Sequence, residues 1–296
     1  MKVLVTGANG LLGQELITLL LKGDLEVIAT SKGPNRLRIP VGERLSYKDL
    51  DITDGLSSHK TVTEYKPDII IHAAAMTQVD QCELNKIDCY NINVTATRFL
   101  IEAAKEIKAR FIYISTDFIF DGSSGPYRED DEPKPLNYYG STKLSAETEV
   151  IESGLEWTIV RTVLVIGNAE ATRSNIISWV KEKLEKGEKI KVVDDQFRTP
   201  TYTEDLAKGI LLIVEKNAQG IFHISGKDLL TPYQIAIKTA EHFRLDNSLI
   251  EKADATSFSQ PALRPPRTGF YIDKARKQLG YEPLSFEEGL KKFFSY

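Results

Sequence analysis

The sequence has few of the residues on which disulfide scaffolds and metal centres depend. Its 296 residues include only two cysteines, four histidines, two methionines and two tryptophans. Cys82 and Cys89 are separated by six residues and have no accompanying Cys/His pair, so their spacing does not support a zinc site. We therefore expect two buried or idle thiols in a reducing compartment, and no bound metal.

An excess of charge of one sign and a long apolar run are also missing. The 38 lysines and arginines and 42 aspartates and glutamates give a net charge of −4, whereas a protein that binds nucleic acid through bulk electrostatics is basic. No apolar stretch approaches the roughly 18 residues of a membrane-spanning helix. The N-terminal residues do not form the basic, apolar and cleavage segments of a signal peptide. We expect a cytoplasmic globular protein that binds neither nucleic acid nor membrane.

What the chain does have is an alternation of short apolar runs with helical patterns. The predicted strands are residues 2–6, 26–30, 69–72, 110–115 and 158–161. The predicted helices between them are residues 11–22, 54–65, 91–107 and 139–153. Short apolar strands separated by helices are typical of a parallel sheet that is covered on both faces. The predicted fold class is α/β, with a Rossmann-type doubly wound parallel sheet.

A glycine turn joins the first predicted strand to the first predicted helix. Residues 6–13 read Thr-Gly-Ala-Asn-Gly-Leu-Leu-Gly. In such a turn Gly7 permits the tight bend, Gly10 lets backbone N–H groups approach a pyrophosphate, and Gly13 allows the helix to pack closely on the strand. The helix N-terminus adds partial positive charge. This pattern predicts a dinucleotide site.

The end of the second predicted strand indicates which dinucleotide is bound. NAD sites usually place a carboxylate there, about 20 residues after the turn. Here the strand is followed by Ser31 and Lys32, with Arg36 shortly after, while Asp24 and Glu26 lie at the opposite end of the strand. Hydroxyls and cations suit a 2′-phosphate, so we predict NADPH. A solvated basic loop that does not discriminate is the alternative, and NADH stays possible.

The last third of the chain predicts a second unit. It contains a predicted helix at residues 175–186, a strand at 190–193, a helix at 203–215 and a Pro-rich loop at 260–267. We interpret residues 1–165 as an NAD(P)-binding Rossmann domain to which residues 203–225 return. Residues 166–202 and 226–296 then form a smaller C-terminal α/β lobe that binds the substrate.

A tyrosine and a lysine four residues apart suggest the chemistry. Tyr139 and Lys143 lie on one face of a predicted helix. A nearby ammonium stabilises phenolate, so we expect Lys143 to lower the pKa of Tyr139 from about 10 toward neutrality. Such a tyrosine can give a proton to a carbonyl oxygen while hydride reaches the carbon. Thr116 ends the preceding strand, at the edge where α/β sheets bind ligands.

With these residues the chain resembles the extended short-chain dehydrogenase/reductase superfamily. The chain carries residues typical of that superfamily in the same order and at approximately the same spacing. They are the three glycines, Asp51-Ile52 after the third strand of the superfamily, Ala73-Ala74-Ala75 after its fourth strand, Asn93, Thr116, and Tyr139 with Lys143. The resemblance implies that residues 51–52 hold adenine, that residues 73–75 line the nicotinamide ribose, and that Asn93 braces a water path. It also implies that Thr116 bonds the substrate carbonyl and that Lys143 holds the ribose hydroxyls.

These considerations give a set of candidate site residues. The candidate catalytic residues are Thr116, Tyr139 and Lys143. The candidate cofactor-binding residues are Gly7, Asn9, Gly10, Leu11, Leu12, Gly13, Ser31, Lys32, Arg36, Asp51, Ile52, Ala73, Ala74, Ala75, Asn93, Tyr139 and Lys143. The candidate substrate-binding residues are Thr77, Val79, Asp117, Arg198 and Arg264.

Within the superfamily, the chain is similar to the dTDP-4-dehydrorhamnose reductase (RmlD-like) family. Residues 72–83, 113–122, 126–140 and 195–201 carry this similarity. It implies NADPH-dependent reduction of the 4-keto group of a nucleotide-activated deoxysugar, most simply the step that forms dTDP-L-rhamnose. Residues 163–166 depart from the pattern of the family, because Val-Leu-Val-Ile stands where Ser-Trp-Val-Tyr is common. The missing tryptophan lies on the substrate side. For Arg198 and Arg264, the resemblance suggests contacts with a diphosphate, and a surface ion pair is the alternative.

Other functions stay open beside the reductase. One is a non-catalytic NADP-binding regulatory subunit resembling the methionine adenosyltransferase beta subunit, and another is a nucleotide-sugar epimerase that keeps its NAD through turnover. A 4,6-dehydratase is disfavoured, because Phe118 stands where those enzymes carry the glutamate of a Thr-Asp-Glu motif. We expect a small-molecule nucleotide sugar as the partner, and a homodimer is possible.

Overall fold

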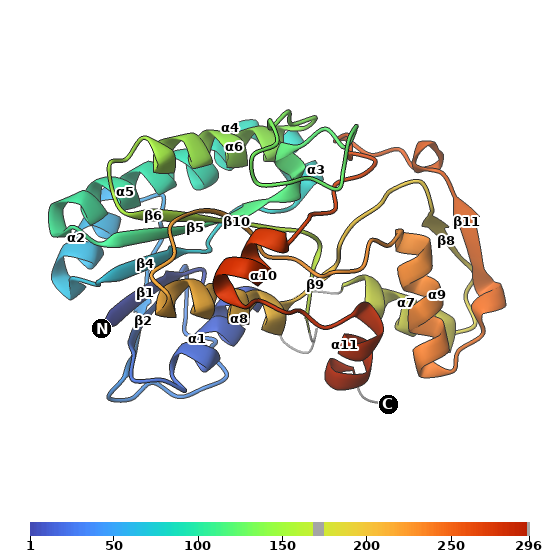
Figure 1. Ribbon diagram of the computed structural model, residues 1–296, viewed down its shortest axis with the longest axis horizontal. Coiled ribbons are helices and arrows are strands. Elements are labelled where there is room, and N and C mark those ends of the chain that lie inside the picture. Colours follow the sequence, from blue (N-terminus) through green and yellow to red (C-terminus); the bar gives the residue numbers. More distant parts are fainter. Residues whose placement is uncertain (168–174, 295–296) are drawn as a thin grey trace.

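A parallel sheet of seven strands forms the centre of the molecule (Figure 1). The computed structural model describes residues 1–167 and 175–294. The strand order is β10-β6-β5-β4-β1-β2-β3, and every neighbouring pair is parallel. The strands are β1 (Lys2–Thr6), β2 (Glu26–Ser31), β3 (Leu45–Asp49), β4 (Ile69–His72), β5 (Arg110–Thr116), β6 (Trp157–Thr162) and β10 (Gly220–His223). The predicted α/β class and doubly wound parallel sheet are confirmed.

In the main sheet, the strands that were predicted from the sequence are those buried on both faces. All four residues of β4, Ile-Ile-Ile-His, are buried, and β1 is buried from Val3 onward. Such strands are continuous apolar runs because helices cover both faces of the sheet. The edge strand β3 reads Leu-Ser-Tyr-Lys-Asp and buries only Leu45, so its own sequence gives little signal.

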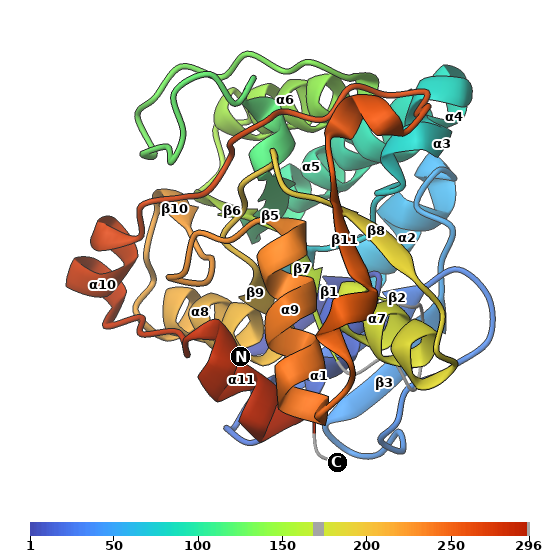
Figure 2. The same cartoon turned by 90° about the vertical axis from the view of Figure 1, so that its right-hand side faces the viewer.

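A second group of elements lies at one end of the sheet. Strand β8 (Ile190–Val193) pairs with β11 (Ile250–Ala253), and β7 (Val165–Ile166) pairs with β9 (Thr201–Tyr202). The helices of this group are α7 (Ile176–Glu185), α9 (Pro232–Phe243) and α11 (Phe286–Phe293). Figure 2 faces this group, with α7, α9 and the β8–β11 pair in front. The assignment of substrate binding to this part of the chain stays a prediction.

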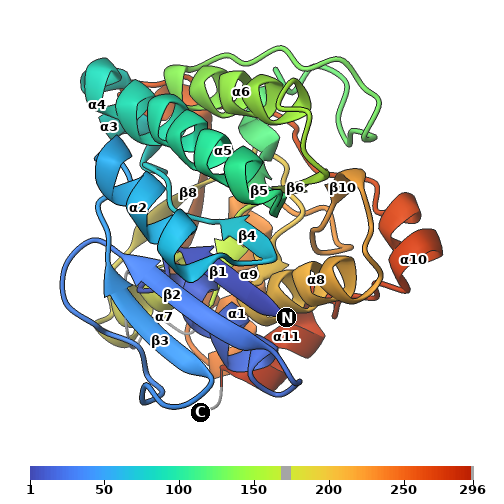
Figure 3. The same ribbon diagram turned by 90° about the vertical axis from the view of Figure 1, so that its left-hand side faces the viewer.

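Helices cover both faces of the main sheet, as Figure 3 shows. One face carries α1 (Leu11–Leu20) and α8 (Thr203–Glu215), with α10 (Asp273–Leu279) beside them; the other carries α2 (Gly55–Tyr65), α5 (Ala96–Ile107) and α6 (Tyr138–Ile151). Each layer buries a stripe of aliphatic side chains against the strands, which is the main source of stability for such a fold. None of the helices in the described ranges is long and apolar enough to cross a membrane.

One predicted helix is interrupted at its start. The pattern at residues 91–107 predicts a single helix, but Asn91–Thr95 forms a π-helical turn and the regular helix α5 follows it. A π turn adds a residue to the helical circumference and is frequent at functional sites. The two short helices before it, α3 (Val79–Leu84) and α4 (Lys86–Tyr90), were not predicted, because they are too short to show a helical period.

The order of strands reverses between β1 and β4. Strand β1 is followed along the chain by β2 on one side of it, whereas β4 and then β5 lie on the other side. The connections that leave the carboxyl ends of β1 and β4 therefore lead to helices on opposite faces of the sheet, and the crevice at such a switch point is where open α/β sheets bind their ligands. The glycine turn follows β1 and residues 73–75 follow β4, so both predicted cofactor segments lie at this crevice.

The space around Gly13 shows how tightly α1 packs against the glycine turn. A Cβ atom at this position would overlap the Gly7 carbonyl oxygen and lie 2.7 Å from the Ala8 Cα, both of which are backbone atoms. We predict that Gly13→Ala lowers the free energy of unfolding by about 1–3 kcal/mol, measured by denaturant titration. Gly23→Ala is the matched control, because its Cβ meets only the Leu20 carbonyl at 3.7 Å. Equal stability of the two variants would contradict this packing.

Candidate active site

A threonine hydroxyl holds the two sides of the crevice together. The Thr6 Oγ1 atom, at the end of β1, accepts hydrogen bonds from the backbone N–H groups of Ala73 and Ala74, each at 3.1 Å. A Cβ atom on Gly7 would lie 2.9 Å from the Ala74 nitrogen, so only glycine permits this approach. Gly7 also has φ +71°, which suits a residue without a side chain. The glycine turn and residues 73–75 are therefore held in contact.

His72 extends this junction into the core. Its Nδ1 atom lies 2.7 Å from Thr6 Oγ1 and its Nε2 atom lies 3.0 Å from Thr97 Oγ1, which in turn donates to the Asn93 carbonyl. Because Thr6 already accepts two amides, its hydrogen points at Nδ1, and the neutral ring carries its proton on Nε2. Burial lowers the pKa of His72 to about 3, and Lys143 contributes in the same direction. His72 is therefore a structural residue that joins Thr6 to Thr97.

The start of α1 offers backbone donors to an anion. Gly10 is the N-cap and has no side chain to satisfy the N–H groups of the first turn, which include those of Leu11, Leu12 and Gly13. A helix N-terminus with unpaired N–H groups is a ready site for a phosphate or pyrophosphate. The donor set at the crevice therefore fits the pyrophosphate of a dinucleotide.

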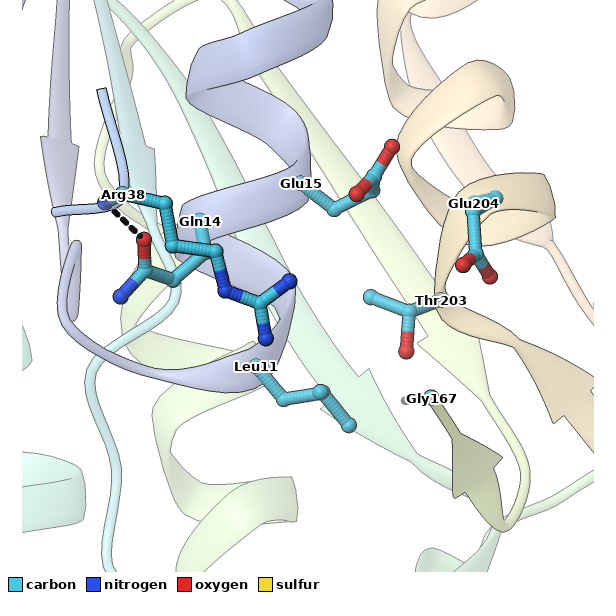
Figure 4. Close-up of a pocket in the computed structure, with 7 residues that line it drawn as sticks. All are labelled: Leu11, Gln14, Glu15, Arg38, Gly167, Thr203 and Glu204. Carbon is cyan, nitrogen blue, oxygen red and sulfur yellow. Dashed lines mark hydrogen bonds between the residues drawn. The ribbon is translucent and has the colours of Figure 1, made fainter. Parts of the chain in front are cut away.

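The loop after β2 is held against α1 by two amide side chains. Asn9 donates to the Pro34 carbonyl and accepts from the Arg36 N–H, both at 3.0 Å. Gln14 donates to the Arg36 carbonyl at 2.8 Å and accepts from the Arg38 N–H at 3.0 Å. Figure 4 shows the Arg38 side chain lying beside Leu11 at the start of α1. Asn9 thus holds a loop in place. The sequence reading did not single out Gln14 or Arg38, because their partners lie more than 20 residues away.

Two predicted cofactor residues form an ion pair with each other. The Lys32 Nζ atom lies 2.7 Å from an oxygen of Asp51, and Lys32 is 79% exposed. The hydrogen bond raises the pKa of Lys32 and, together with Thr53, lowers that of Asp51 to about 2. Ser31 ends β2 beside this pair, and Ile52 is buried under α2 and α5. This group lies at the carboxyl edge of β2.

Helix α6 begins unusually close to the end of β5. Its N-cap Asn137 accepts a bond from the Gly140 N–H at 2.9 Å. A Cβ atom on Gly140 would overlap the Phe118 carbonyl, so glycine allows the helix to approach residues 117–118. Tyr139 is buried at this contact, with its ring edge-on to that of Phe118 at 6.0 Å. The structure therefore brings Thr116 and Tyr139 together.

The pKa of Tyr139 is raised in this structure, whereas the spacing of Tyr139 and Lys143 predicts a lowered pKa. Burial raises the pKa of Tyr139, and only the hydrogen bond with Thr116 acts strongly in the opposite direction. Lys143 does not lower it, because the Lys143 Nζ atom instead donates to the Ile114 carbonyl at 2.7 Å and lies over the Tyr113 ring at 4.1 Å. Burial lowers the pKa of Lys143 itself to about 7, against the opposing effect of Glu147. The expected lowering of the Tyr139 pKa by Lys143 is therefore wrong in this arrangement.

Asn93 connects the loop after β4 to helix α6. From the π turn, its side chain accepts a bond from the Met76 N–H at 2.8 Å and donates to Thr142 Oγ1 at 3.1 Å. Cys82 and Cys89 are unbridged, buried and packed with Tyr139. Asn93 thus joins residues 76 and 142 through hydrogen bonds. Its expected role in a water path to Lys143 stays a prediction.

The arginine at position 198 is buried. Its guanidinium donates to the Pro265 carbonyl at 2.6 Å and the Phe197 carbonyl at 2.7 Å, and its Nε atom lies 3.8 Å from Asp117. Asp117 also accepts from Thr268, and its burial raises its pKa. The alternative of a surface ion pair is therefore wrong for Arg198, since Arg198 and Asp117 are both buried and most of the Arg198 donors bind backbone carbonyls. It joins the loop around residue 265 to the end of β5.

Arg264 forms a two-point ion pair with the start of α3. Its two terminal nitrogens lie 2.6 and 2.7 Å from the two oxygens of Asp80. This contact joins the Pro-rich loop to the segment after β4, where Thr77 is exposed and Val79 packs near Tyr139. The predicted substrate residues thus lie on both sides of the site. Among the described residues, no group of three or more His, Cys, Asp or Glu side chains could hold a metal ion.

Known proteins share this arrangement over the whole chain. A family model described as the RmlD substrate binding domain matches residues 1–296. A solved dTDP-4-dehydrorhamnose reductase from Clostridium acetobutylicum is 32% identical with a TM-score of 0.89, covering 99% of this chain and 98% of that one. A dTDP-4-dehydrorhamnose reductase from Bacillus anthracis, solved in complex with NADP, is 30% identical with a TM-score of 0.85, covering 99% and 98%. Methionine adenosyltransferase 2 subunit beta from Bos taurus is 32% identical over 253 residues, which are 83% of this chain and 73% of that protein.

The neutral His72 predicts how stability depends on pH. An unfolded histidine titrates near pH 6.5, whereas His72 in the folded protein has a pKa of about 3. Below pH 6.5 the unfolded state therefore binds a proton that the folded state excludes, and stability is lost as the pH falls toward 3. We predict that His72→Gln removes about 2 kcal/mol of the stability difference between pH 7 and pH 5. Denaturant titrations at both pH values measure this, and parallel losses in the wild type and the variant would refute it.

Proposed function

This chain belongs to the RmlD substrate-binding domain family, and we propose that it is an NADPH-dependent reductase of the 4-keto group of a nucleotide-activated deoxysugar. The first candidate substrate is dTDP-4-dehydrorhamnose. The observation that carries the proposal is the buried contact between Thr116 and Tyr139, one helical turn from Lys143, at the carboxyl edge of the sheet beside the glycine turn.

A nicotinamide dinucleotide bound at the crevice would supply the hydride for this reduction. Residues 7–13 would hold its pyrophosphate through the backbone N–H groups at the start of α1. Residues 73–75 would lie along its nicotinamide ribose, because Thr6 holds them beside the turn. The Bacillus anthracis reductase, solved with NADP, supports this choice of cofactor.

Burial keeps Tyr139 protonated at neutral pH, as the direction of the reaction requires. A phenol that is neutral at pH 7 has a proton to give, and reduction of a ketone requires a proton at the carbonyl oxygen. Thr116 would orient that oxygen by a hydrogen bond. A positive charge on Lys143 would stabilise the phenolate as the proton leaves, which requires its ammonium group to face the Tyr139 oxygen rather than the Ile114 carbonyl that it bonds in this structure.

The loop after β2 supports the preference for NADPH. Lys32 is exposed, and Asn9 and Gln14 hold the backbone at residues 36 and 38 against the start of α1. Arg36 and Arg38 therefore carry guanidinium groups on a fixed loop near the position of an adenosine ribose. Forked donors of this kind bind a phosphate in two-point fashion.

One residue near the predicted substrate position favours a reductase over a dehydratase. Phe118 packs edge-on against Tyr139, where a 4,6-dehydratase would carry a glutamate to remove a proton. Arg264 lies on the Pro-rich loop with a carboxylate partner that a substrate diphosphate would replace. A regulatory role without catalysis is the second candidate, because the methionine adenosyltransferase subunit is as similar in identity as the reductases.

Turnover with a defined substrate tests the proposal. We predict that the purified protein oxidises NADPH with dTDP-4-dehydrorhamnose, followed by absorbance at 340 nm, and that Tyr139→Phe lowers kcat by about 100-fold or more. The variant keeps its affinity for NADPH, because Phe retains the packing of the ring. Isothermal titration calorimetry measures that affinity.

A panel of other nucleotide-activated 4-keto sugars accompanies this substrate. Turnover with another sugar alone corrects the substrate and keeps the reductase. Tight NADP binding without turnover on any sugar, together with a protein that co-purifies, would establish the regulatory alternative. Unchanged kcat in Tyr139→Phe would refute the assigned proton donor.

The loop after β2 generates a separate prediction about the cofactor. Replacing Lys32 and Arg36 by alanine together should raise the KM for NADPH about tenfold or more and leave the KM for NADH within about twofold, because only NADPH carries the 2′-phosphate. Lys22→Ala, an exposed cation after α1, is the control and should change neither value. Equal increases for both cofactors would contradict a 2′-phosphate site on this loop.

A further inference from the structure

A buried ion pair lies directly beneath the catalytic helix. Glu147 is on α6, one helical turn after Lys143, and Arg161 is on β6. The guanidinium meets the carboxylate in two-point geometry, with Arg161 Nε 3.1 Å from Oε1 and Nη2 2.8 Å from Oε2 of Glu147. The two side chains are only 3% and 1% exposed. Taking two charges out of water is costly, and such a pair is often no more stabilising than apolar residues of the same size.

The rest of the Arg161 side chain is held equally firmly. Its remaining terminal nitrogen donates to the Glu129 carbonyl at 3.2 Å, and the guanidinium lies 5.4 Å from the centre of the Phe120 ring. In the sheet, Arg161 is the register partner of Ser115, the residue before Thr116. The pair therefore has a fixed position relative to both β5 and α6.

Lys143 is the third charged group of this cluster. On its own helix it has Tyr139 one turn before and Glu147 one turn after. From the neighbouring elements it faces Tyr113 of β5, His72 of β4, and the thiols of Cys82 and Cys89 from α3 and α4. His72 is neutral, as its hydrogen bonds require, and burial keeps the Tyr113 hydroxyl protonated. Of these groups only Glu147 is a carboxylate.

We propose that Glu147 is a positioning residue for the reaction: its carboxylate, fixed by Arg161, keeps the buried Lys143 side chain positively charged. The inference rests on the proposed function for its catalytic consequence, because the reduction needs a cation beside the phenolate of Tyr139. It does not rest on the identity of the sugar or on the cofactor. A carboxylate four residues away on a helix is within the range in which opposite charges favour each other's ionised form.

The direction of the effect follows from the environment of Lys143. Burial lowers the pKa of Lys143 to about 7, and Glu147 is the largest influence that raises it. Removing the carboxylate therefore lowers the pKa further, and Lys143 loses its proton at a lower pH. Activity that depends on a charged Lys143 is then lost at a lower pH on the alkaline side of the profile.

The experiment uses two variants, so that the proposal can still be tested if one of them fails to fold. Glu147→Gln removes the carboxylate but leaves Arg161 buried without its partner, which destabilises the fold. The double variant Glu147→Gln with Arg161→Met removes both charges and leaves no unpaired one. Thermal unfolding shows which variants are folded at 25 °C. Glu149→Gln, at a half-buried carboxylate on the same helix that pairs with Arg98, is the control.

The first readout needs no turnover. Carbon-13 labelling of the lysine ε-carbons allows NMR to follow the titration of Lys143, whose signal is assigned by its loss in Lys143→Met. We expect the midpoint to fall by about one pH unit in every folded variant that lacks Glu147 and to stay unchanged in Glu149→Gln. A purely structural pair predicts a wild-type midpoint in the folded double variant, and that result would overturn the proposal.

The second readout is the pH profile of kcat with the substrate found for the wild type. In the double variant the alkaline limb should move by about one pH unit, so that kcat on that limb falls about tenfold while KM changes little. An unmoved limb together with a lowered NMR midpoint would overturn the catalytic consequence. If the wild type reduces no sugar, the proposed function fails, whereas the NMR titration still decides the role of Glu147.

Discussion

The parallel pairing of β1 with β4 determines where the candidate cofactor segments lie. In this register Thr6 stands opposite His72, so the turn after one strand and the loop after the other leave the sheet side by side. The Thr6 hydroxyl then bonds two amides across the gap and the histidine behind it. A slip of one residue would turn the Thr6 side chain to the opposite face of the sheet and break all three contacts. Because β2 and β5 pair outward from this centre, Ser31 and Thr116 end at the same edge.

The second constraint is the burial of a lysine beside a tyrosine. Helix α6 approaches the sheet closely because Gly140 has no side chain at the Phe118 carbonyl, and this approach places Lys143 under the surface. An ammonium group in such a place needs electron-rich neighbours, and it has the Ile114 carbonyl, the face of the Tyr113 ring and the Glu147 carboxylate. The same burial keeps Tyr139 protonated. A site that keeps a buried phenol neutral has a proton to give, which is the requirement of the proposed reduction.

The sequence was most informative where one residue type was needed for a local reason. The glycine turn, the two-face burial of β1 and β4, and the helical spacing of Tyr139 and Lys143 all follow from short-range geometry. The edge strand β3 could not be predicted from its own pattern, because four of its five residues keep contact with solvent. The role of Asn9 as a loop anchor and the ionisation of Tyr139 depend on residues 27 and 23 positions away, Arg36 and Thr116. Only the folded chain shows such long-range partners.

Three of the cations expected to meet a phosphate are paired with carboxylates in this structure, and the pairs differ in how readily they would exchange. Lys32 is 79% exposed beside Asp51, Arg264 is 18% exposed beside Asp80, and Arg198 is 6% exposed beside Asp117. To replace the carboxylate, an anionic ligand must bind the cation more strongly than the carboxylate does, and it must also be able to reach the cation. Lys32 and Arg264 meet both conditions, since their partners stay partly in water and lose little when released. Arg198 does not, because it is buried and most of its donors bind backbone carbonyls, and releasing them would leave polar groups without partners. In the proposed function, phosphate recognition therefore falls to the partly exposed pairs, while Arg198 keeps the Pro-rich loop at the end of β5.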